Sequence, residues 1–257
     1  GPMLEDAGFD SIWIGEHSHI PVSRATPYPT GGDMPWQYTT MMDPFISLTQ
    51  IGEHTTNLLL GLGVALPLEH DVLALAKTAA TLDVLSNGRL QFGVGVGWNQ
   101  EELANHSSVK WSMRYRALAE CVGALRSLWV DDESEFHGEY FNFDKVWSRP
   151  KPSQQPHPPI WFGAGGKLGS RHTIAWADGW MPLDVTLGDV TKRVNKFRQL
   201  SADAGRHDIP ISMVAFGDPT LDTLLMYRDL GIERVIVGSG RDGWEDQSGV
   251  PAFIDRY

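Results

Sequence analysis

The 257-residue sequence has little cysteine, a deficit of basic residues and no long apolar run. Cys121 is its single cysteine, so no disulfide can form within the chain, and its apolar helical surroundings predict a buried thiol. Lys and Arg number 21 against 32 Asp and Glu, a formal net charge of −11. Because nucleic-acid binding needs basic patches that neutralise phosphates, we expect no nucleic-acid partner.

Membrane and export signals are also missing from the sequence. No stretch reaches the roughly 18 apolar residues of a membrane-spanning helix, and the opening GPMLEDAGFDS lacks the regions of a signal peptide. We therefore expect a cytoplasmic protein with no membrane partner. The 42% hydrophobic and 21% charged residues are typical of a globular protein.

Short apolar runs alternate with helical patterns along the chain, which predicts an α/β fold with right-handed crossovers. The apolar runs do not alternate in polarity, as is typical of parallel strands covered by helices on both faces. Strands are predicted at 11–15, 58–66, 90–96, 159–163, 179–183, 211–216 and 234–238. Helices are predicted at 43–55, 72–85, 114–130, 170–177, 190–205 and 221–231.

This length suits one (β/α)8 barrel, and no linker is evident, so we predict a single barrel domain over residues 1–257. The barrel needs eight strands, and seven are predicted here, the first of them after what reads as the end of a helix. The first strand is therefore expected to be missing: either the sequence starts after it, or the barrel is open at that edge. Residues 131–159 are predicted to be an insertion in one barrel unit.

Several motifs, in this order, resemble the luciferase-like monooxygenase superfamily. They are GFDSIWIGEH at 8–17, LDVLSNGRLQFGVGVGW at 82–98, PPIWFGAGG at 158–166 and ADGWMP at 177–182. The resemblance spans nearly the whole chain and is greatest to the deazaflavin-dependent branch. It implies a TIM-barrel redox enzyme that uses coenzyme F420 and acts on a small-molecule substrate. We also expect a homodimer.

His17 ends the first predicted strand, and active sites of such barrels gather at these strand ends. The resemblance implies a catalytic histidine here, and an imidazole that titrates near neutrality suits proton transfer. The alternative is that His17 only anchors a loop. The pair His17-x-His19 also invites a metal interpretation, but the later strand ends FGAGG and VIVGSG offer no further ligands, so no metal is predicted.

Two glycines, Gly61 and Gly63, lie in the second predicted strand, where glycine usually marks a bulge or the close approach of another group. The resemblance implies a bulge with a non-prolyl cis peptide that supports the back of the cofactor ring. On this sequence it falls at Gly63–Val64. The alternative is tight packing against a helix.

The third predicted strand ends in a glycine-rich run without the G-x-G-x-x-G spacing of dinucleotide-binding folds. The resemblance places Gly95, Gly97 and Trp98 beside the cofactor, with Trp98 at the mouth of the site. Certain sugar-phosphate dehydrogenases of the family have a catalytic glutamate where this chain has Trp98, so their proton relay does not transfer. Glu101 and Glu102 are interpreted as first-turn acids of a helix.

The fourth strand is followed by the best candidate for a phosphate site. Small residues there let backbone N–H groups point at an anion ahead of a helix, and a lysine adds positive charge. A plain connecting turn is the alternative. The residues are Gly163, Ala164, Gly165, Gly166 and Lys167.

A long irregular segment, SHIPVSRATPYPTGGDMPWQYTTMMDP at 18–44, is rich in aromatic residues and glycine. Loops of this kind usually cover sites, so Trp36, Tyr38 and Met41 are candidates for the wall of a substrate pocket. They would equally suit docking on the barrel rim.

Three functions remain open from the sequence. The leading hypothesis is hydride transfer between coenzyme F420 and an unidentified small organic substrate. The first alternative is an FMN-dependent monooxygenase, since both cofactors share ring geometry and a ribityl phosphate. The second alternative, favoured by the missing first strand, is a non-catalytic barrel subunit.

Overall fold

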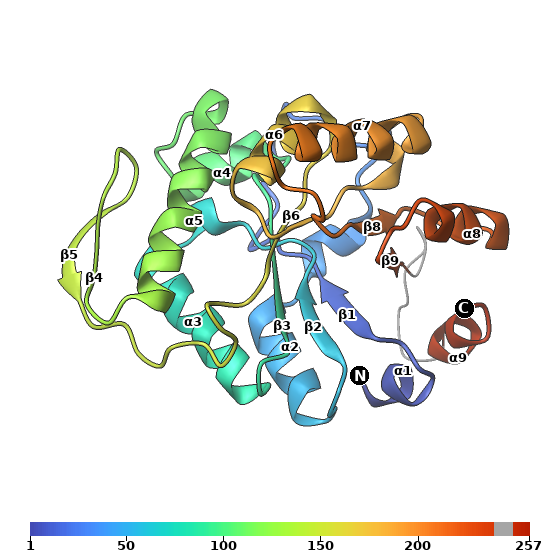
Figure 1. The fold of residues 1–257 in the computed structure, drawn as a ribbon, viewed down its shortest axis with the longest axis horizontal. Helices are drawn as coiled ribbons and strands as arrows, with labels where there is room; N and C mark the ends of the chain where they lie inside the picture. The colour runs from blue at the N-terminus through green and yellow to red at the C-terminus, as the bar shows by residue number, and fades with distance from the viewer. Residues whose placement is uncertain (239–248) are drawn as a thin grey trace. The chain divides into compact units, whose positions relative to one another are not determined.

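The computed structural model describes residues 1–238 and 249–257. The chain forms two compact units, Gly1–Ile160 and Trp161–Tyr257, and each is described by itself (Figure 1). No helix in the described ranges is long and apolar enough to cross a membrane. The last two residues of VIVGSG lie outside the described residues.

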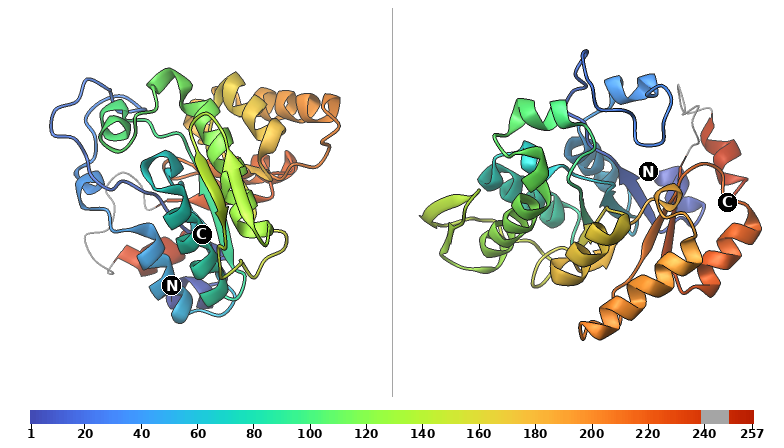
Figure 2. Two further views of the ribbon diagram at one scale, coloured as in Figure 1. Left: turned by 90° about the vertical axis from the view of Figure 1, so that its left-hand side faces the viewer. Right: turned by 90° about the horizontal axis from the view of Figure 1, so that it is seen from above.

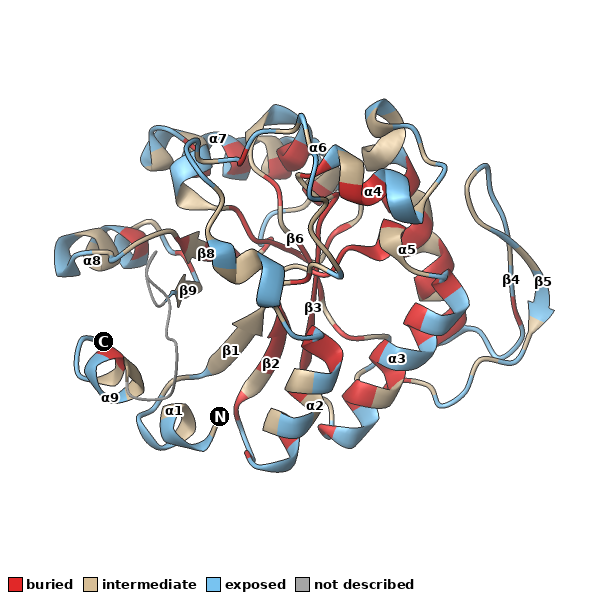
Figure 3. Ribbon diagram, turned by 180° about the vertical axis from the view of Figure 1, so that it is seen from behind, coloured by how far each residue is buried: buried red, intermediate tan, exposed pale blue. Residues whose placement is uncertain are grey.

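The first unit is built on a parallel sheet in which strand order follows chain order. Its strands are β1 (Ser11–Ile14), β2 (Leu59–Leu62) and β3 (Leu90–Val94). Ser11 pairs with Leu59, and Leu60 pairs with Leu90. Figure 3 shows β2 and β3 as largely buried, as the apolar sequence of these strands predicts. The segments that follow the carboxyl ends of β1, β2 and β3 carry His17, Val64 and Trp98, respectively.

Helices of the first unit begin at side-chain caps that the sequence supplies. Asp43 accepts a hydrogen bond from the Ile46 N–H, and Asp71 accepts one from the Ala74 N–H, so each satisfies a free helix-end donor. Cys121 in α5 is fully buried, as predicted.

The helices of the first unit are α1 (Pro2–Asp6), α2 (Pro44–Glu53), α3 (Val72–Leu85), α4 (Gln100–His106) and α5 (Arg114–Val130), with 3-10 turns η1 (Trp36–Thr40), η2 (Pro67–Glu69) and η3 (Trp111–Met113).

The predicted insertion contains an antiparallel hairpin of β4 (Ser134–His137) and β5 (Asn142–Val146). The hairpin lies beside α5 in both views of Figure 2. The Ser134 hydroxyl donates to the Ser127 carbonyl oxygen at 2.8 Å, and the Phe136 ring packs where Gly123 leaves room. These contacts fix the hairpin to the outer surface of the helix.

The second unit has two parallel strand pairs. β6 (Ile160–Phe162) pairs with β7 (Gly179–Trp180), and β8 (Ser212–Ala215) pairs with β9 (Arg234–Val237). Single parallel bridges, Trp180 to Ile211 and Leu183 to Val214, connect the two pairs. Trp180 stacks on Phe197 at a ring-centroid distance of 4.2 Å in the core of this unit. Its helices are α6 (Gly166–Trp176), α7 (Val190–Asp203), α8 (Leu221–Asp229) and α9 (Gly249–Ile254), with the 3-10 turn η4 (Asp184–Thr186).

These elements confirm the α/β class and the parallel direction of the main strands. Each of the predicted strands contains an observed one. The strand pairing does not by itself close a barrel, so the single closed (β/α)8 domain stays a prediction.

Candidate active site

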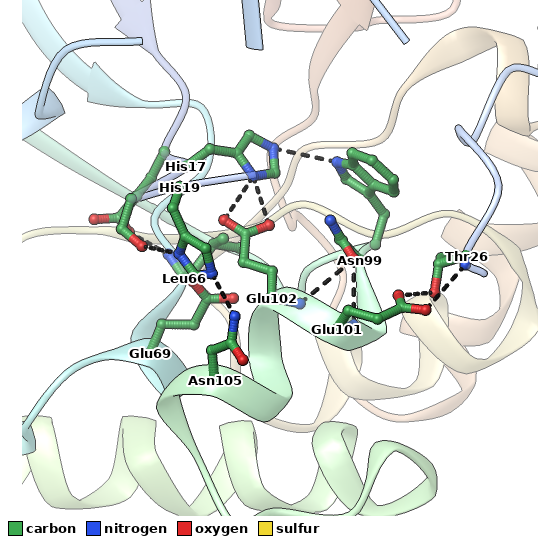
Figure 4. A network of polar contacts seen from close by, with 12 residues as sticks. His17, His19, Thr26, Leu66, Glu69, Asn99, Glu101, Glu102 and Asn105 are labelled. Atoms are coloured by element: carbon green, nitrogen blue, oxygen red, sulfur yellow. Dashed lines mark hydrogen bonds and ion pairs between the residues drawn. The ribbon is translucent and has the colours of Figure 1, made fainter. Parts of the chain in front are cut away.

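The His17 imidazole is held from both sides just beyond the end of β1. Its Nδ1 lies 2.8 and 2.9 Å from the two carboxylate oxygens of Glu102, and its Nε2 lies 3.2 Å from Trp98 Nε1 (Figure 4). An indole N–H only donates, so Nε2 must accept and the ring proton must lie on Nδ1, where it is donated to Glu102. The neighbours therefore select one neutral tautomer of His17.

Glu102 lies in the first turn of α4 and its side chain is 1% exposed. The Asn99 side-chain oxygen caps this helix by accepting from the N–H groups of Glu101 and Glu102 at 3.2 and 3.4 Å. The first-turn placement of both glutamates is confirmed, and the amino end of a helix favours carboxylates. The interpretation as helix acids was incomplete, because Glu102 also holds His17 from 85 residues away along the chain.

Two aromatic rings pack on His17 and a third packs on those two, and we call Tyr28, Tyr38 and Trp98 the aromatic cover. The ring centroid of Tyr38 lies 5.2 Å from that of His17, and that of Trp98 lies 5.7 Å away. Tyr28 packs edge-on against both other rings, and its hydroxyl lies 3.1 Å from that of Tyr38. Burial, followed by the bond to Tyr28, raises the pKa of Tyr38, so its phenol stays neutral.

The other two candidates from the long segment make no described contact with the His17 ring. Trp36 is 58% exposed and is not brought to His17 by any described contact. Met41 lies nearer the strand ends, where a Cβ added at Gly15 would be 3.4 Å from its methyl carbon and 3.2 Å from the Gly63 carbonyl oxygen. Tyr38 is thus the predicted wall residue that reaches the histidine.

Beside His17 lies an acidic cluster that the sequence did not predict: Glu16, Glu69 and Glu102. Glu16 accepts from the Leu66 N–H at 2.6 Å and pairs with His70 Nε2 at 2.8 Å, which raises the pKa of His70. Glu69 is buried, and the charges of Glu102 and Glu16 add to that burial to raise its pKa to about 8. Within the described ranges, no three His, Cys, Asp or Glu residues are arranged to hold a metal ion.

A pocket of about 700 Å³ opens next to this cluster in the first unit. This size lies in the usual range for small-molecule sites. His70 and His106 contribute to its wall, and His106 Nε2 lies 3.7 Å from Glu69. Its further lining includes Leu68, Ser107, Ser108, Lys110, Met113 and Tyr140.

The residues predicted to support the cofactor ring lie directly after β2. The Gly63–Val64 peptide bond is cis, which confirms that part of the prediction. Gly63 N–H donates to the Ile14 carbonyl, and Glu16 N–H donates to the Val64 carbonyl, so hydrogen bonds on both sides of the cis peptide connect it to the end of β1. Gly61 packs tightly against a neighbouring strand rather than a helix, since a Cβ there would overlap the indole of Trp13 in β1. Support of a cofactor ring by Gly63 and Val64 stays a prediction.

The end of β3 carries the remaining candidates of the first unit. Gly95 N–H donates to the Ala65 carbonyl at 2.9 Å, and Gly97 has a φ of 71°, a conformation that favours glycine. The side chain of Asn99, a residue only 1% exposed, has an Nδ2 group without a hydrogen-bond partner among the described residues. An unpaired buried donor is costly, so this group suits a ligand that brings an acceptor.

The candidate phosphate loop lies in the second unit, where α6 begins at Gly166. Gly165 precedes the helix without a side-chain cap, and Gly166 has a φ of 71°. A Cβ at Gly165 would lie 2.6 Å from the Thr186 hydroxyl oxygen, so this position has no room for a side chain. Lys167 is exposed in the first helical turn, whose N–H groups lack partners within the helix. Anion binding here stays a prediction that this geometry suits.

Comparison with known proteins decides the family. The sequence profile described as luciferase-like monooxygenase matches residues 2–222. The chain belongs to this family. An uncharacterized protein of Mycobacterium tuberculosis is 37% identical over 260 residues, which cover 99% of this chain and 89% of that protein. The luciferase-like resemblance of the motifs is thereby confirmed.

Relatives with described activities fall into two cofactor groups. The oxygenase component of a flavin-dependent trigonelline monooxygenase from Acinetobacter baylyi is 34% identical over 63% of this chain and 41% of its own. An F420-dependent glucose-6-phosphate dehydrogenase from Amycolatopsis mediterranei is 30% identical over 69% of this chain and 50% of its own. The chain thus spans half or less of the length of these two luciferase-like relatives, which use either a flavin or F420.

A solved structure supports the same fold. The monooxygenase RslO1 from Streptomyces bottropensis matches with a TM-score of 0.69 and 23% identity, over 88% of this chain and 66% of that one. At this identity the likeness concerns the fold alone.

Proposed function

We propose that this luciferase-like protein is an oxidoreductase that transfers hydride between coenzyme F420 and a small organic substrate. The observation that carries the proposal is the His17 imidazole, held by Glu102 in one tautomer and enclosed by the aromatic cover. Hydride transfer to or from oxygen-bearing carbon needs a partner that moves a proton, and a positioned imidazole suits that role.

The residues present fit a deazaflavin or a flavin. The unpaired Asn99 Nδ2 group would donate to a ring carbonyl, and Gly63 with Val64 would lie against the ring. In the second unit, the N–H groups of residues 163–167 and the Lys167 ammonium are by themselves a candidate site for a phosphate. When bound, the cofactor supplies or accepts the hydride.

His17 then moves the accompanying proton at Nε2. During reduction of a carbonyl, Nε2–H of the protonated ring donates its proton to the substrate oxygen while hydride adds to carbon, which gives the alcohol. During oxidation the neutral ring takes that proton back. In both directions Trp98 must give up its bond to Nε2, while Glu102 continues to accept from Nδ1. The aromatic cover limits the access of water to this proton.

FMN-dependent monooxygenation is the second candidate, and the flavin-dependent relative at 34% identity favours it as much as the F420-dependent one favours the first. The two reduced cofactors differ in their reaction with oxygen. Reduced F420 has carbon at the reactive position and resists oxidation by air, whereas reduced FMN reacts with oxygen. Homodimer formation and a cytoplasmic location remain part of the proposal.

The deciding experiment titrates the purified chain with F420 and with FMN, each followed by fluorescence. The holoprotein is then reduced and exposed to air. Tight F420 binding with a reduced form that persists in air is expected. Tight FMN binding with rapid oxidation in air would replace the proposal with monooxygenation. Binding of neither cofactor would favour the non-catalytic subunit.

A further inference from the structure

Residues 18–43, which we call the covering loop, are fastened to α4 at both ends of that helix. At its amino end, Glu101 accepts from Ala25 N–H at 2.6 Å, Thr26 N–H at 3.3 Å and the Thr26 hydroxyl at 2.6 Å. At its carboxyl end, the Asn105 side chain lies 2.8 Å from His19 Nε2. The loop is therefore tied along the helix by side chains rather than by backbone pairing (Figure 4).

The Glu101 attachment lies directly before the part of the loop that encloses the histidine. Tyr28 lies two residues after Thr26, and further along the loop Tyr38 packs on His17. The next residue after Glu101 on the helix is Glu102, which holds His17. One helical turn thus fixes both the histidine and the segment that covers it.

The covered arrangement has to open during a reaction. The side chain of His17 is 8% exposed, and its Nε2 is occupied by the Trp98 N–H. A substrate cannot reach Nε2 until the rings over it separate. Trp98 lies outside the covering loop, but Tyr38 leaves His17 only if the loop moves relative to α4, where Glu101 holds it.

We propose that Glu101 is a positioning residue that keeps the covering loop closed over His17 and so sets how readily cofactor and substrate enter. Its three bonds all go to the loop and none to His17, so it acts through Tyr28 and Tyr38. The Thr26 hydroxyl and then the Ala25 N–H lower the pKa of Glu101 to about 2, so its carboxylate remains ionised near neutral pH. Protonation of Glu101 does not release the loop under such conditions. The part of this proposal that concerns turnover rests on the proposed function.

The first test is hydrogen–deuterium exchange on the whole chain without ligand. Glu101→Ala should speed exchange of the amides in 18–43 about tenfold, because the loop then opens more often. Glu101→Gln keeps one acceptor oxygen, so its exchange rate in 18–43 should lie between those of Glu101→Ala and the parent. Thr26→Val removes only the hydroxyl and provides a milder second variant that tests the same attachment.

Glu5→Ala is the matched control. Glu5 in α1 accepts from the N–H groups of Thr56, Asn57 and Leu58, so it also holds a loop to a helix, but one that precedes β2. Its loss should speed exchange around 55–59 and leave 18–43 unchanged. Parental exchange of 18–43 in both Glu101→Ala and Thr26→Val would overturn the proposal.

The second test mixes F420 with each variant in a stopped-flow fluorimeter. Glu101→Ala should raise the rates of F420 association and dissociation together, and Glu5→Ala should not. Faster amide exchange with unchanged F420 rates would refute control of entry by Glu101. If the parent binds no F420 at all, the proposed function fails, while the exchange result still decides whether Glu101 holds the loop.

Discussion

Replacement of Glu102 by glutamine tests whether the carboxylate sets the state of His17. The variant keeps the size of the side chain and one acceptor for Nδ1, but removes the charge from a site where Glu102 is 1% exposed. A hydrogen bond to a charged group contributes about 1.5 to 3 kcal/mol and a neutral one about 0.5 to 1.5 kcal/mol. The difference, about 1 to 1.5 kcal/mol, corresponds to a roughly tenfold lower kcat if the charge acts in the transition state.

The assay compares kcat and KM of Glu102→Gln with those of the parent for any accepted substrate. We expect the loss in kcat and little change in KM, because Glu102 contacts His17 rather than the open side of the ring. Nitrogen-15 NMR of the ligand-free protein should show that His17 keeps its Nδ1–H form, because Trp98 Nε1 still donates to Nε2, while the Nδ1 signal shifts because its acceptor has lost its charge. Glu53→Gln removes the same charge from an exposed residue and serves as the control. A parental kcat and an unchanged His17 spectrum in Glu102→Gln would refute the reasoning.

Three further predictions concern single residues. His17→Ala should keep most cofactor affinity but slow single-turnover hydride transfer about 100-fold to 10,000-fold, and a parental rate would leave His17 as a loop anchor. Lys167→Glu should weaken F420 binding in a fluorescence titration, because a like charge replaces a cation near the phosphate; unchanged affinity would place the phosphate elsewhere. Glu69 has a folded-state pKa raised to about 8, so the folded state holds a proton that the unfolded state loses from about pH 4.5 upward. Between about pH 5 and pH 8 the free energy of unfolding of the parent should therefore fall relative to that of Glu69→Gln, and parallel pH curves from urea denaturation would contradict the burial of this proton.

The sequence was sufficient to predict those helices and strands whose position is determined by a local apolar pattern. Helices α3 and α5 begin and end where their apolar periodicity does, and β2 and β3 were identified from short apolar runs typical of strands buried on both faces. The β4–β5 hairpin was missed because its strands, SEFH and NFDKV, are largely polar and lie on the surface, where no apolar pattern is required.

The candidate site was predictable only in part. His17 was found because it follows a strand and matches the family's histidine, and the Gly63–Val64 cis bond was found through the family resemblance. Glu102 was not assigned to the site, because its role depends on a contact between two segments that no local pattern encodes. The Trp98 bond that selects the tautomer likewise requires three-dimensional placement of its indole.

The short span from Trp98 to Glu102 limits how the chain can change in length. Each added residue in an α-helix turns the following side chains by about 100° and advances them by about 1.5 Å. A one-residue insertion after Asn99 would turn the Glu102 carboxylate away from His17 and carry the Glu101 carboxylate away from Thr26. The span from Trp98 to Glu102 therefore has to keep its length. Insertions and deletions are tolerated only in the segments on either side, such as the covering loop and the residues after α4.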